Sequence, residues 1–336
     1  MELLENDQIT EISSGPVSEK YIVINWLVNN VCNYRCSYCD SALWSGSNRG
    51  TPWSNLNRFI NDLEQLFPAK RLHFQLTGGE PTIWTGLSDL LSYCSSNGHI
   101  VGLTTNGSRA LSFWENHRGH FNWVNVSYHS ESANHEHLLR LVELLAPHTK
   151  LSVRVMMNPA PEQWKRCLKF IDTLKDTTSP EAYFIEVVPL TDPLSVPGPD
   201  AKSFLKYTED QWQTIHQFNG GFWKETATKK YFMGPKPSPW DHVVKTETGK
   251  SVGLNPSELI VSGRHRFKGW TCYAGIDNFF IDQDGNIVSA TCRESKPIGN
   301  INQSNWHLSK SPVICPFNTC LCGTDISIPK RRVVDN

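Results

Sequence analysis

Three cysteines lie close together near the start of the chain, in the stretch VCNYRCSYCD. Cys32, Cys36 and Cys39 follow the spacing C-x3-C-x2-C, with no fourth cysteine or histidine close by. Thiolates prefer soft cations, so three of them in one loop can converge on a single metal site. A structural zinc ion would take four ligands, commonly from paired CxxC motifs. On a cubane of four irons, three cysteines leave one iron open to a substrate or cofactor.

A second group of five cysteines lies near the C-terminus. Two of them flank the segment 278–290, which predicts a β-hairpin with its turn at Asp284-Gly285. Four thiolates from this group would close a second metal site. The five are Cys272, Cys292, Cys315, Cys320 and Cys322. Cys94 and Cys167 stand alone inside predicted helices, where buried free cysteine is common.

The composition is that of a globular protein without a strong electrostatic bias. The 336 residues suffice for one large domain, or for a medium domain with an appendage, and the apolar fraction is 39%. A formal net charge of -1 indicates no nucleic-acid surface and no anionic membrane partner. The first 20 residues do not read as a signal peptide, and the apolar run 21–28 is too short to span a bilayer. We therefore expect a cytoplasmic protein whose thiols stay reduced.

Segments typical of strands and helices alternate along the first half of the chain. This pattern predicts an α/β fold with a parallel sheet and right-handed crossovers. Ligand sites of such sheets lie at the carboxyl ends of the strands. The predicted strands are 21–28, 71–76, 99–105, 121–129, 151–157 and 182–190. The strand ends carry the cysteine loop, Gly78-Gly79-Glu80, Asn106-Gly107 and Ser127-Tyr128-His129.

The cysteine loop resembles the signature of the radical S-adenosylmethionine (radical SAM) superfamily, including the aromatic Tyr38 before the last cysteine. The resemblance implies that Cys32, Cys36 and Cys39 hold a [4Fe–4S] cluster whose open iron chelates the amino and carboxylate groups of SAM. An electron from the reduced cluster would cleave SAM, and the resulting 5′-deoxyadenosyl radical would abstract hydrogen from an unactivated C–H bond. It also implies a partial (β/α)6 TIM barrel over roughly residues 20–190.

Other strand ends carry motifs that fit this family. LTGGEP (76–81) resembles its GGE motif, in which Glu80 can accept a hydrogen bond from the SAM ammonium group and the glycines allow close approach. TTNGS (104–108) resembles the third-strand motif, and Ser127 matches a position that contacts SAM. The SAM contacts implied by the resemblance are Tyr38, Gly78, Gly79, Glu80, Asn106 and Ser127. The residue types alone also allow a plain turn at Gly-Gly-Glu and a helix cap at Ser127.

The sequence does not identify the catalytic acid or base. His129 lies close to the expected site and is one candidate base. Arg154 and Glu186, on the fifth and sixth predicted strands, either face the barrel interior as functional groups or form a buried ion pair.

The C-terminal cysteines resemble the SPASM or twitch extension of radical SAM enzymes, which binds an auxiliary [4Fe–4S] cluster. Six residues separate Gly285 from Cys292, where the SPASM pattern has four, and five cysteines replace the full set of seven. We therefore favour the twitch-like form with one auxiliary cluster. Its expected ligands are Cys272, Cys292, Cys320 and either Cys315 or Cys322. A structural zinc ion is the alternative.

These observations predict four segments. They are a polar N-terminal segment 1–20, the barrel 21–190, a connecting region 191–265 and a small hairpin-containing auxiliary-cluster domain 266–336. The expected activity is an oxidoreductase-like hydrogen abstraction from a peptide or a small biosynthetic intermediate, giving oxidation, a cross-link or epimerisation. A flavodoxin or ferredoxin is the expected electron donor.

Three alternatives stay open. The enzymatic one is a small-molecule or nucleotide-modifying dehydrogenase. A zinc-binding adaptor without catalysis would have no need of Gly-Gly-Glu and Asn-Gly at strand ends. An electron-transfer iron–sulfur protein would need four ligands at the first site, where Cys32, Cys36 and Cys39 offer three.

Overall fold

The structure, a computed structural model, describes the chain apart from short gaps and one longer one. The described residues are 7–13, 20–177, 182–192, 203–215, 218, 242–254, 259–260, 263–292, 296–303, 305–320 and 322–333. Parts of the predicted N-terminal segment, 1–6 and 14–19, therefore lie outside the described residues. The same holds for 193–202 and 219–241 of the predicted connecting region.

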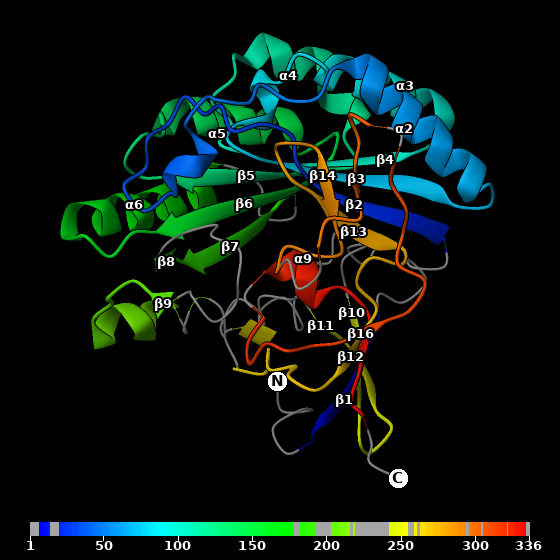
Figure 1. The fold of residues 1–336 in the computed structure, drawn as a ribbon. Coiled ribbons are helices and arrows are strands. Elements are labelled where there is room, and N and C mark those ends of the chain that lie inside the picture. The colour runs from blue at the N-terminus through cyan, green and yellow to red at the C-terminus, as the bar shows by residue number, and fades with distance from the viewer. Residues whose placement is uncertain are drawn as a thin grey trace.

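Six parallel strands form the centre of the fold (Figure 1). Each strand pairs with the next one along the chain, in the order β2-β3-β4-β5-β6-β7. Their carboxyl ends consequently meet at one edge of the sheet, as the alternating pattern predicted. The strands are β2 (Tyr21–Leu27), β3 (Arg71–Thr77), β4 (Ile100–Thr105), β5 (Trp123–His129), β6 (Lys150–Met157) and β7 (Phe184–Pro189).

Helices connect these strands and cover one face of the sheet, the upper face in Figure 1. Each buries an apolar stripe at helical spacing; α2, for example, buries Leu56, Phe59, Ile60 and Leu63. Gly98 ends α3 with a left-handed φ of 71°, which glycine adopts without strain. The helices are α2 (Trp53–Leu66), α3 (Leu87–Asn97), α4 (Leu111–His117), α5 (His135–Leu145) and α6 (Pro161–Thr177). Short 3-10 turns are η2 (Ser41–Leu43), η3 (Pro81–Ile83) and η4 (Arg118–His120).

The two faces of the sheet differ in polarity because side chains alternate along each strand. On β5 the residues that pack in the core with the helices are apolar or aromatic, whereas the alternate residues on the inner face are polar. The first set is Val124, Val126 and Tyr128, and the second is Asn125, Ser127 and His129. The inner face of the barrel therefore offers polar groups to whatever binds there.

The C-terminal hairpin extends this same sheet beyond β2. β13 (Asn278–Ile281) runs parallel to β2, and β14 (Asn286–Val288) and β15 (Gly299–Asn300) follow it outward. Asn25 Nδ2 donates to Asn278 Oδ1 at 3.0 Å, and Phe279 packs edge-on against Phe59 of α2. We expected the hairpin in a separate domain. It joins the barrel because β2 would otherwise leave its edge unpaired.

A second sheet combines segments from both ends of the chain. Its order is β11-β10-β1-β17-β12-β16. Ile12 of β1 is fully buried beside Val244, so part of the expected polar N-terminal segment is a core strand. Its partners lie more than 200 residues away, beyond the reach of local periodicity. The strands are β1 (Ile9–Ser13), β10 (His242–Thr246), β11 (Ser251–Leu254), β12 (Thr271–Cys272), β16 (Val313–Ile314) and β17 (Lys330–Arg331).

Three small elements complete the described fold. The strands β8 (Thr191–Asp192) and β9 (Ser203–Phe204) pair with each other, and residues 209–215 are helical. The short helix α9 (Gly323–Ile326) follows the last cysteine. None of the helices in the described ranges has the length and hydropathy needed to cross a bilayer.

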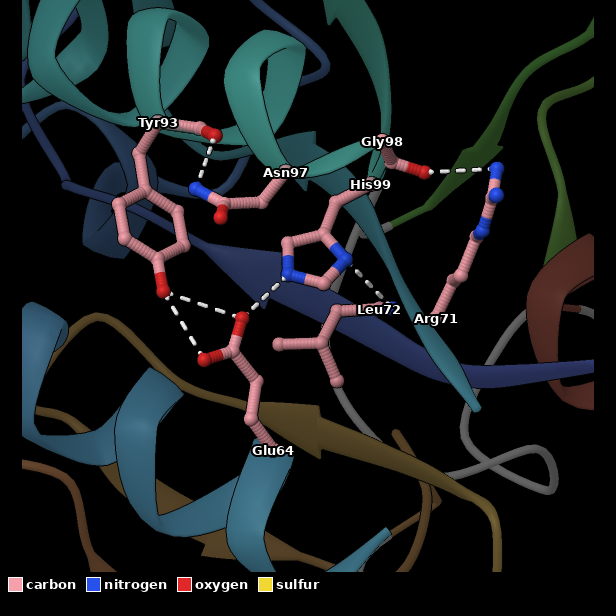
Figure 2. A network of polar contacts seen from close by, with 7 residues as sticks. All are labelled: Glu64, Arg71, Leu72, Tyr93, Asn97, Gly98 and His99. Carbon is pink, nitrogen blue, oxygen red and sulfur yellow. Dashed lines mark hydrogen bonds and ion pairs between the residues drawn. The ribbon is translucent and has the colours of Figure 1, made fainter. Parts of the chain in front are cut away.

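A polar network fastens α2 and α3 to the amino-terminal end of the sheet (Figure 2). The Glu64 carboxylate accepts from Tyr93 Oη at 3.0 Å and meets His99 Nε2 at 2.6 Å. His99 Nδ1 accepts the backbone N–H of Leu72 at 3.2 Å, so the proton of a neutral ring lies on Nε2, toward Glu64. The network lies at the opposite end of the strands from the cysteine loop and has a structural role.

Candidate active site

The cysteine loop leaves the carboxyl end of β2 and lies over the edge where the strands end. Cys36 is buried, and Cys32 and Cys39 are half-buried. The backbone N–H of Cys39 donates to Cys36 O at 3.0 Å, which closes a turn between these two residues. The backbone N–H of Tyr34 donates to Cys32 Sγ at 3.3 Å. The structure thus brings the three thiols into one compact loop.

The electrostatics of the loop favour neutral thiols until a cation is present. Burial raises the pKa of Cys36 to about 11 and that of Cys39 to about 12, and neighbouring sulfurs add to both shifts. Burial also raises the pKa of Cys32. The thiols lie near enough to one another for each thiolate to destabilise the next. Such a set fits a positively charged iron–sulfur core, which would offset that repulsion.

The Gly-Gly-Glu turn after β3 packs directly against the start of the cysteine loop. Gly79 N donates to Asn29 O at 3.0 Å, and Glu80 N donates to Val31 O at 2.7 Å. A Cβ on Gly79 would lie 2.4 Å from Val31 O, so no larger residue fits. From the sequence we expected these glycines to allow the close approach of a ligand. In the structure the glycines give that space to the backbone of the cysteine loop.

Glu80 is buried and its carboxylate is surrounded by protein donors. Oε1 accepts from the Oγ1 atoms of Thr82 and Thr105, each at 2.7 Å, and from Thr82 N at 3.1 Å. Oε2 accepts from Asn106 N at 2.8 Å. Burial raises the pKa of Glu80, and these four donors oppose that rise. The carboxylate therefore ties the turn after β3 to the end of β4. Its contact with the SAM ammonium group stays a prediction.

Asn106 links the end of β4 to the cysteine loop. Its Nδ2 donates to Asn33 Oδ1 at 3.0 Å and lies 3.8 Å from Cys32 Sγ. Asn33 Nδ2 in turn donates to Ser108 Oγ at 2.9 Å. The side chains of TTNGS thus hold the first cysteine of the loop in place.

The end of β5 holds the other side of the loop. Tyr38 Oη and His129 Nδ1 are 2.7 Å apart, and the two rings stack. Burial and, to a smaller extent, the Arg154 guanidinium lower the pKa of His129 to about 4. His129 is thus neutral at neutral pH, and the tautomer of its ring decides whether Tyr38 Oη donates to Nδ1 or accepts from it. Ser127 is buried two residues earlier on the same strand.

Arg154 and Glu186 form an ion pair on the inner face of the barrel. Arg154 Nε lies 2.8 Å from Glu186 Oε2, and the two side chains are 30% and 15% exposed. They lie opposite each other in the register of β6 and β7, and Arg154 lies opposite Ser127 of β5. The ion-pair reading is confirmed. The pair also remains accessible from the barrel interior.

The C-terminal cysteines gather around the second sheet. Cys272 on β12 is buried in a small apolar cluster that Cys292 and Cys315 also contact, and Cys315 and Cys320 border the neighbouring cluster. Burial raises the pKa of Cys320 well above its usual value, and Cys322 and Cys292 lie near enough to contribute. Chain segments up to 50 residues apart therefore converge here. In the described ranges, no group of three or more His, Cys, Asp or Glu side chains is placed to hold a single metal ion.

Two buried charges brace this region. Asp325 accepts from Thr291 N and from Cys292 N, each at 3.1 Å, which connects α9 to the Cys292 loop. Lys330 is buried and donates to the backbone carbonyls of Asp325 and Ile328. Its ammonium group opposes the burial-driven rise in the pKa of Cys320. Sequence analysis missed both residues.

Four other residues at the cysteine loop were also missed, although their types carried a weak signal. They are polar residues at or just after strand ends, where the fold rule places ligand sites. Thr105 donates to Glu80, and Glu131 accepts from Ser37 of the loop. Asn33 belongs to the loop and bonds to Asn106, and Asn158 donates to Glu131. They are Asn33, Thr105, Glu131 and Asn158. The lone cysteines Cys94 and Cys167 are buried in α3 and α6, as expected of core residues.

Comparison with known proteins places this site in a family. Residues 26–191 match the radical SAM superfamily, a stretch that begins in β2 and ends just after β7. The chain thus carries a radical SAM domain over these residues, and this domain indicates an enzyme. This confirms the sequence prediction of class and fold.

Two curated relatives match a shorter stretch. The 7-carboxy-7-deazaguanine synthase of Haemophilus influenzae is 32% identical over 82 residues, 24% of this chain and 34% of that protein. The enzyme of the same name from Rhodopirellula baltica is 37% identical over 78 residues, 23% of this chain and 28% of that protein. The matches span about a third of the length of these relatives.

Solved structures resemble the chain over a longer range. Native anSMEcpe with bound AdoMet gives a TM-score of 0.50 at 17% identity, covering 85% of this chain and 79% of that one. Streptococcus suis SuiB bound to precursor peptide SuiA gives 0.51 at 12% identity, covering 85% and 63%. At these identities the likeness shows a shared fold.

Glu80 offers a test of how the loops are held together. Glu80→Ala should lower the free energy of unfolding by about 2–3 kcal/mol, because buried donors from Thr82, Thr105 and Asn106 lose their acceptor. Chemical denaturation of the apoprotein measures this. Glu143→Ala, on the exposed side of α5, is the matched control and should change stability little. Equal stability of the two variants would contradict the structural role of Glu80.

Proposed function

We propose that Cys32, Cys36 and Cys39 hold a [4Fe–4S] cluster and that the chain uses it to cleave SAM reductively and abstract hydrogen from a substrate C–H bond. The observation that carries this proposal is the anchored loop of three mutually close thiols at the carboxyl edge of a parallel sheet. The radical SAM domain over residues 26–191 supports it. When bound, the cluster and SAM supply the 5′-deoxyadenosyl radical.

The protein groups around the loop position and shield this chemistry. Glu80 keeps the turns after β3 and β4 together, and Asn106 places Asn33 and Cys32. Tyr38 packs over His129, which stays neutral and so adds no positive charge beside Arg154. SAM contacts from Tyr38, Gly78, Gly79, Glu80, Asn106 and Ser127 remain part of the proposal, with the glycines acting through their backbone.

The substrate is proposed to be a polar molecule that binds over the inner face of the barrel. Asn125 and Thr104 lie on that face with Nδ2 and Oγ1 3.4 Å apart, and the Arg154–Glu186 pair is accessible beside them. Peptides and small biosynthetic intermediates both fit such a surface. Both curated relatives are named for synthesis of a small molecule, so the sequence comparison favours the second class. Oxidation, cross-linking or epimerisation would follow hydrogen abstraction.

We also propose that the C-terminal cysteines hold one auxiliary [4Fe–4S] cluster. Support comes from the shared packing of Cys272, Cys292 and Cys315 and from the proximity of Cys320 and Cys322 to Cys292. The buried Lys330 ammonium lies near Cys320 and would favour a thiolate-ligated cluster. Four thiolates would complete the cluster, with Cys272, Cys292 and Cys320 as the preferred three. A flavodoxin or ferredoxin in a reducing, cytoplasmic compartment would supply electrons.

The SAM cluster is tested by metal analysis and product formation. After anaerobic reconstitution we expect about eight irons per chain, four for each of two clusters, and release of 5′-deoxyadenosine from SAM with a reductant. Cys36→Ala should abolish 5′-deoxyadenosine and lose about half of the iron. Cys94→Ala, in the core of α3, is the control and should keep both. Stoichiometric zinc with little iron would support the adaptor alternative instead.

The auxiliary cluster is tested on the C-terminal group. Cys292→Ala should remove about half of the iron because it breaks one cluster of two. The SAM cleavage that occurs without substrate should persist, since Cys32, Cys36 and Cys39 are intact. Cys167→Ala, buried in α6, serves as the matched control. An unchanged iron content in Cys292→Ala would rule out Cys292 as a ligand, and the same result in Cys272→Ala would end the auxiliary-cluster proposal.

The substrate class is tested by stimulation of SAM cleavage. A protease-treated, low-molecular-weight cell extract should increase 5′-deoxyadenosine formation, and a peptide fraction should not. Arg154→Met should weaken the stimulation, because the accessible guanidinium is lost, while the basal rate persists. Stimulation that disappears after protease treatment would instead establish a peptide substrate.

A further inference from the structure

Glu131 holds the middle of the cysteine loop from across the mouth of the barrel. It lies two residues after β5, whereas the loop follows β2, three strands away in the sheet. Glu131 Oε2 accepts the backbone N–H of Ser37 at 2.7 Å, and Oε1 accepts Ser37 Oγ at 2.6 Å. Ser37 stands between Cys36 and Cys39. Both carboxylate oxygens therefore bind the residue that separates two of the thiols.

A third contact extends this connection to β6. Asn158, the residue that follows β6, donates from Nδ2 to Glu131 Oε1 at 2.7 Å. Its Oδ1 accepts the backbone N–H of Ala160 at 3.0 Å, at the start of α6. Glu131 is thus held in place by Asn158 at the carboxyl end of β6. The cysteine loop receives a rigid support rather than a single flexible side chain.

Glu131 acts on the cysteine loop through two properties, its negative charge and its hydrogen bonds. A carboxylate near Cys36 raises the pKa of that thiol, so its charge disfavours thiolate ligands. The geometry is favourable in a different way, since two charge-assisted hydrogen bonds to one residue fix both its backbone and its side chain. Asn106 and His129 hold residues 33 and 38, on either side of Ser37.

We propose that Glu131 is a positioning residue for the SAM cluster, which fixes Ser37 and thereby the spacing of the Cys36 and Cys39 thiols. This inference rests on the proposed function of the cysteine loop. Removing a partner in the shell behind metal ligands typically weakens metal binding by 10–100-fold. Without Glu131 the loop remains attached at Asn33 and Tyr38 but loses its central support.

The test compares cluster retention in Glu131→Ala, Glu131→Gln and Ser37→Ala with the wild type. The loss of visible iron–sulfur absorbance to a chelator should be about 10-fold faster in Glu131→Ala. Gln keeps the size of Glu and can still accept from Ser37 N, but its amide nitrogen would then face the Asn158 Nδ2 donor. Glu131→Gln should therefore lie between Glu131→Ala and wild type. Ser37→Ala keeps the backbone contact and should be intermediate. Glu143→Ala is the matched acidic control.

Two further readouts assign the effect to the right site. Cys36→Ala defines how much absorbance belongs to the auxiliary cluster, and that part should decay equally in all variants. In the electron paramagnetic resonance spectrum of the reduced protein, the change on SAM addition should be diminished in Glu131→Ala and partly restored in Glu131→Gln. The unfolding midpoint of the apoprotein should shift little, since the contacts lie in a surface loop.

The outcomes separate this proposal from the proposed function. A wild-type protein without iron, or without a spectral response to SAM, would overturn the function and the positioning role together. A normal wild type whose Glu131→Ala variant loses its cluster no faster would overturn the positioning role alone. The same follows if the auxiliary cluster is lost equally fast in Glu131→Ala, because that would indicate a general loss of structure.

Discussion

The buried carboxylate of Glu80 is the constraint on which the site depends. A carboxylate removed from water must find hydrogen-bond donors, and Glu80 finds four, from Thr82, Thr105 and Asn106. Those donors are available only when the turn after β3 and the end of β4 come together. The adjoining Gly79 and Glu80 amides bind the first residues of the cysteine loop. The hydrogen bonds that Glu80 requires therefore hold the carboxyl ends of β2, β3 and β4 together.

The cysteine loop is held on several sides before any metal arrives. Its first part is bonded to the turn after β3 and, through Asn33, to Asn106, and its second part to residues after β5. Burial meanwhile raises the pKa values of its thiols and so disfavours thiolate charge in the loop. Rigid placement of neutral thiols suits a cluster that binds by displacing protons, because little ordering of the chain remains to be done.

The remainder of the chain completes the barrel rather than standing apart from it. β13 continues the parallel sheet past β2, so the hairpin between Cys272 and Cys292 is part of the same sheet as the site. β12, which carries Cys272, belongs to the second sheet together with β1 and β17. The barrel sheet and the second sheet are thus joined through the cysteine-rich C-terminal region.

The sequence by itself determined the class of the protein, because its strongest signals are local. Cysteine spacing, Gly-Gly-Glu and Asn-Gly at strand ends, and the alternation of strands and helices each depend on a few neighbouring residues, and the parallel sheet then brings them together. The partial barrel and its six strands were predictable for this reason. The apolar stripes of α2 and α5 were equally clear, since the helical period exposes them.

Only the tertiary structure decided which contacts those residues make. That Gly79 packs against the backbone of the cysteine loop, and that Glu80 accepts from four protein donors, depends on contacts between segments that sequence patterns do not link. The same is true of Glu131 and Ser37, 94 residues apart, and of β1, whose partners lie at the other end of the chain. Such pairings leave no local period, because the groups that satisfy a buried or unpaired polar atom are chosen by the packing of the whole fold.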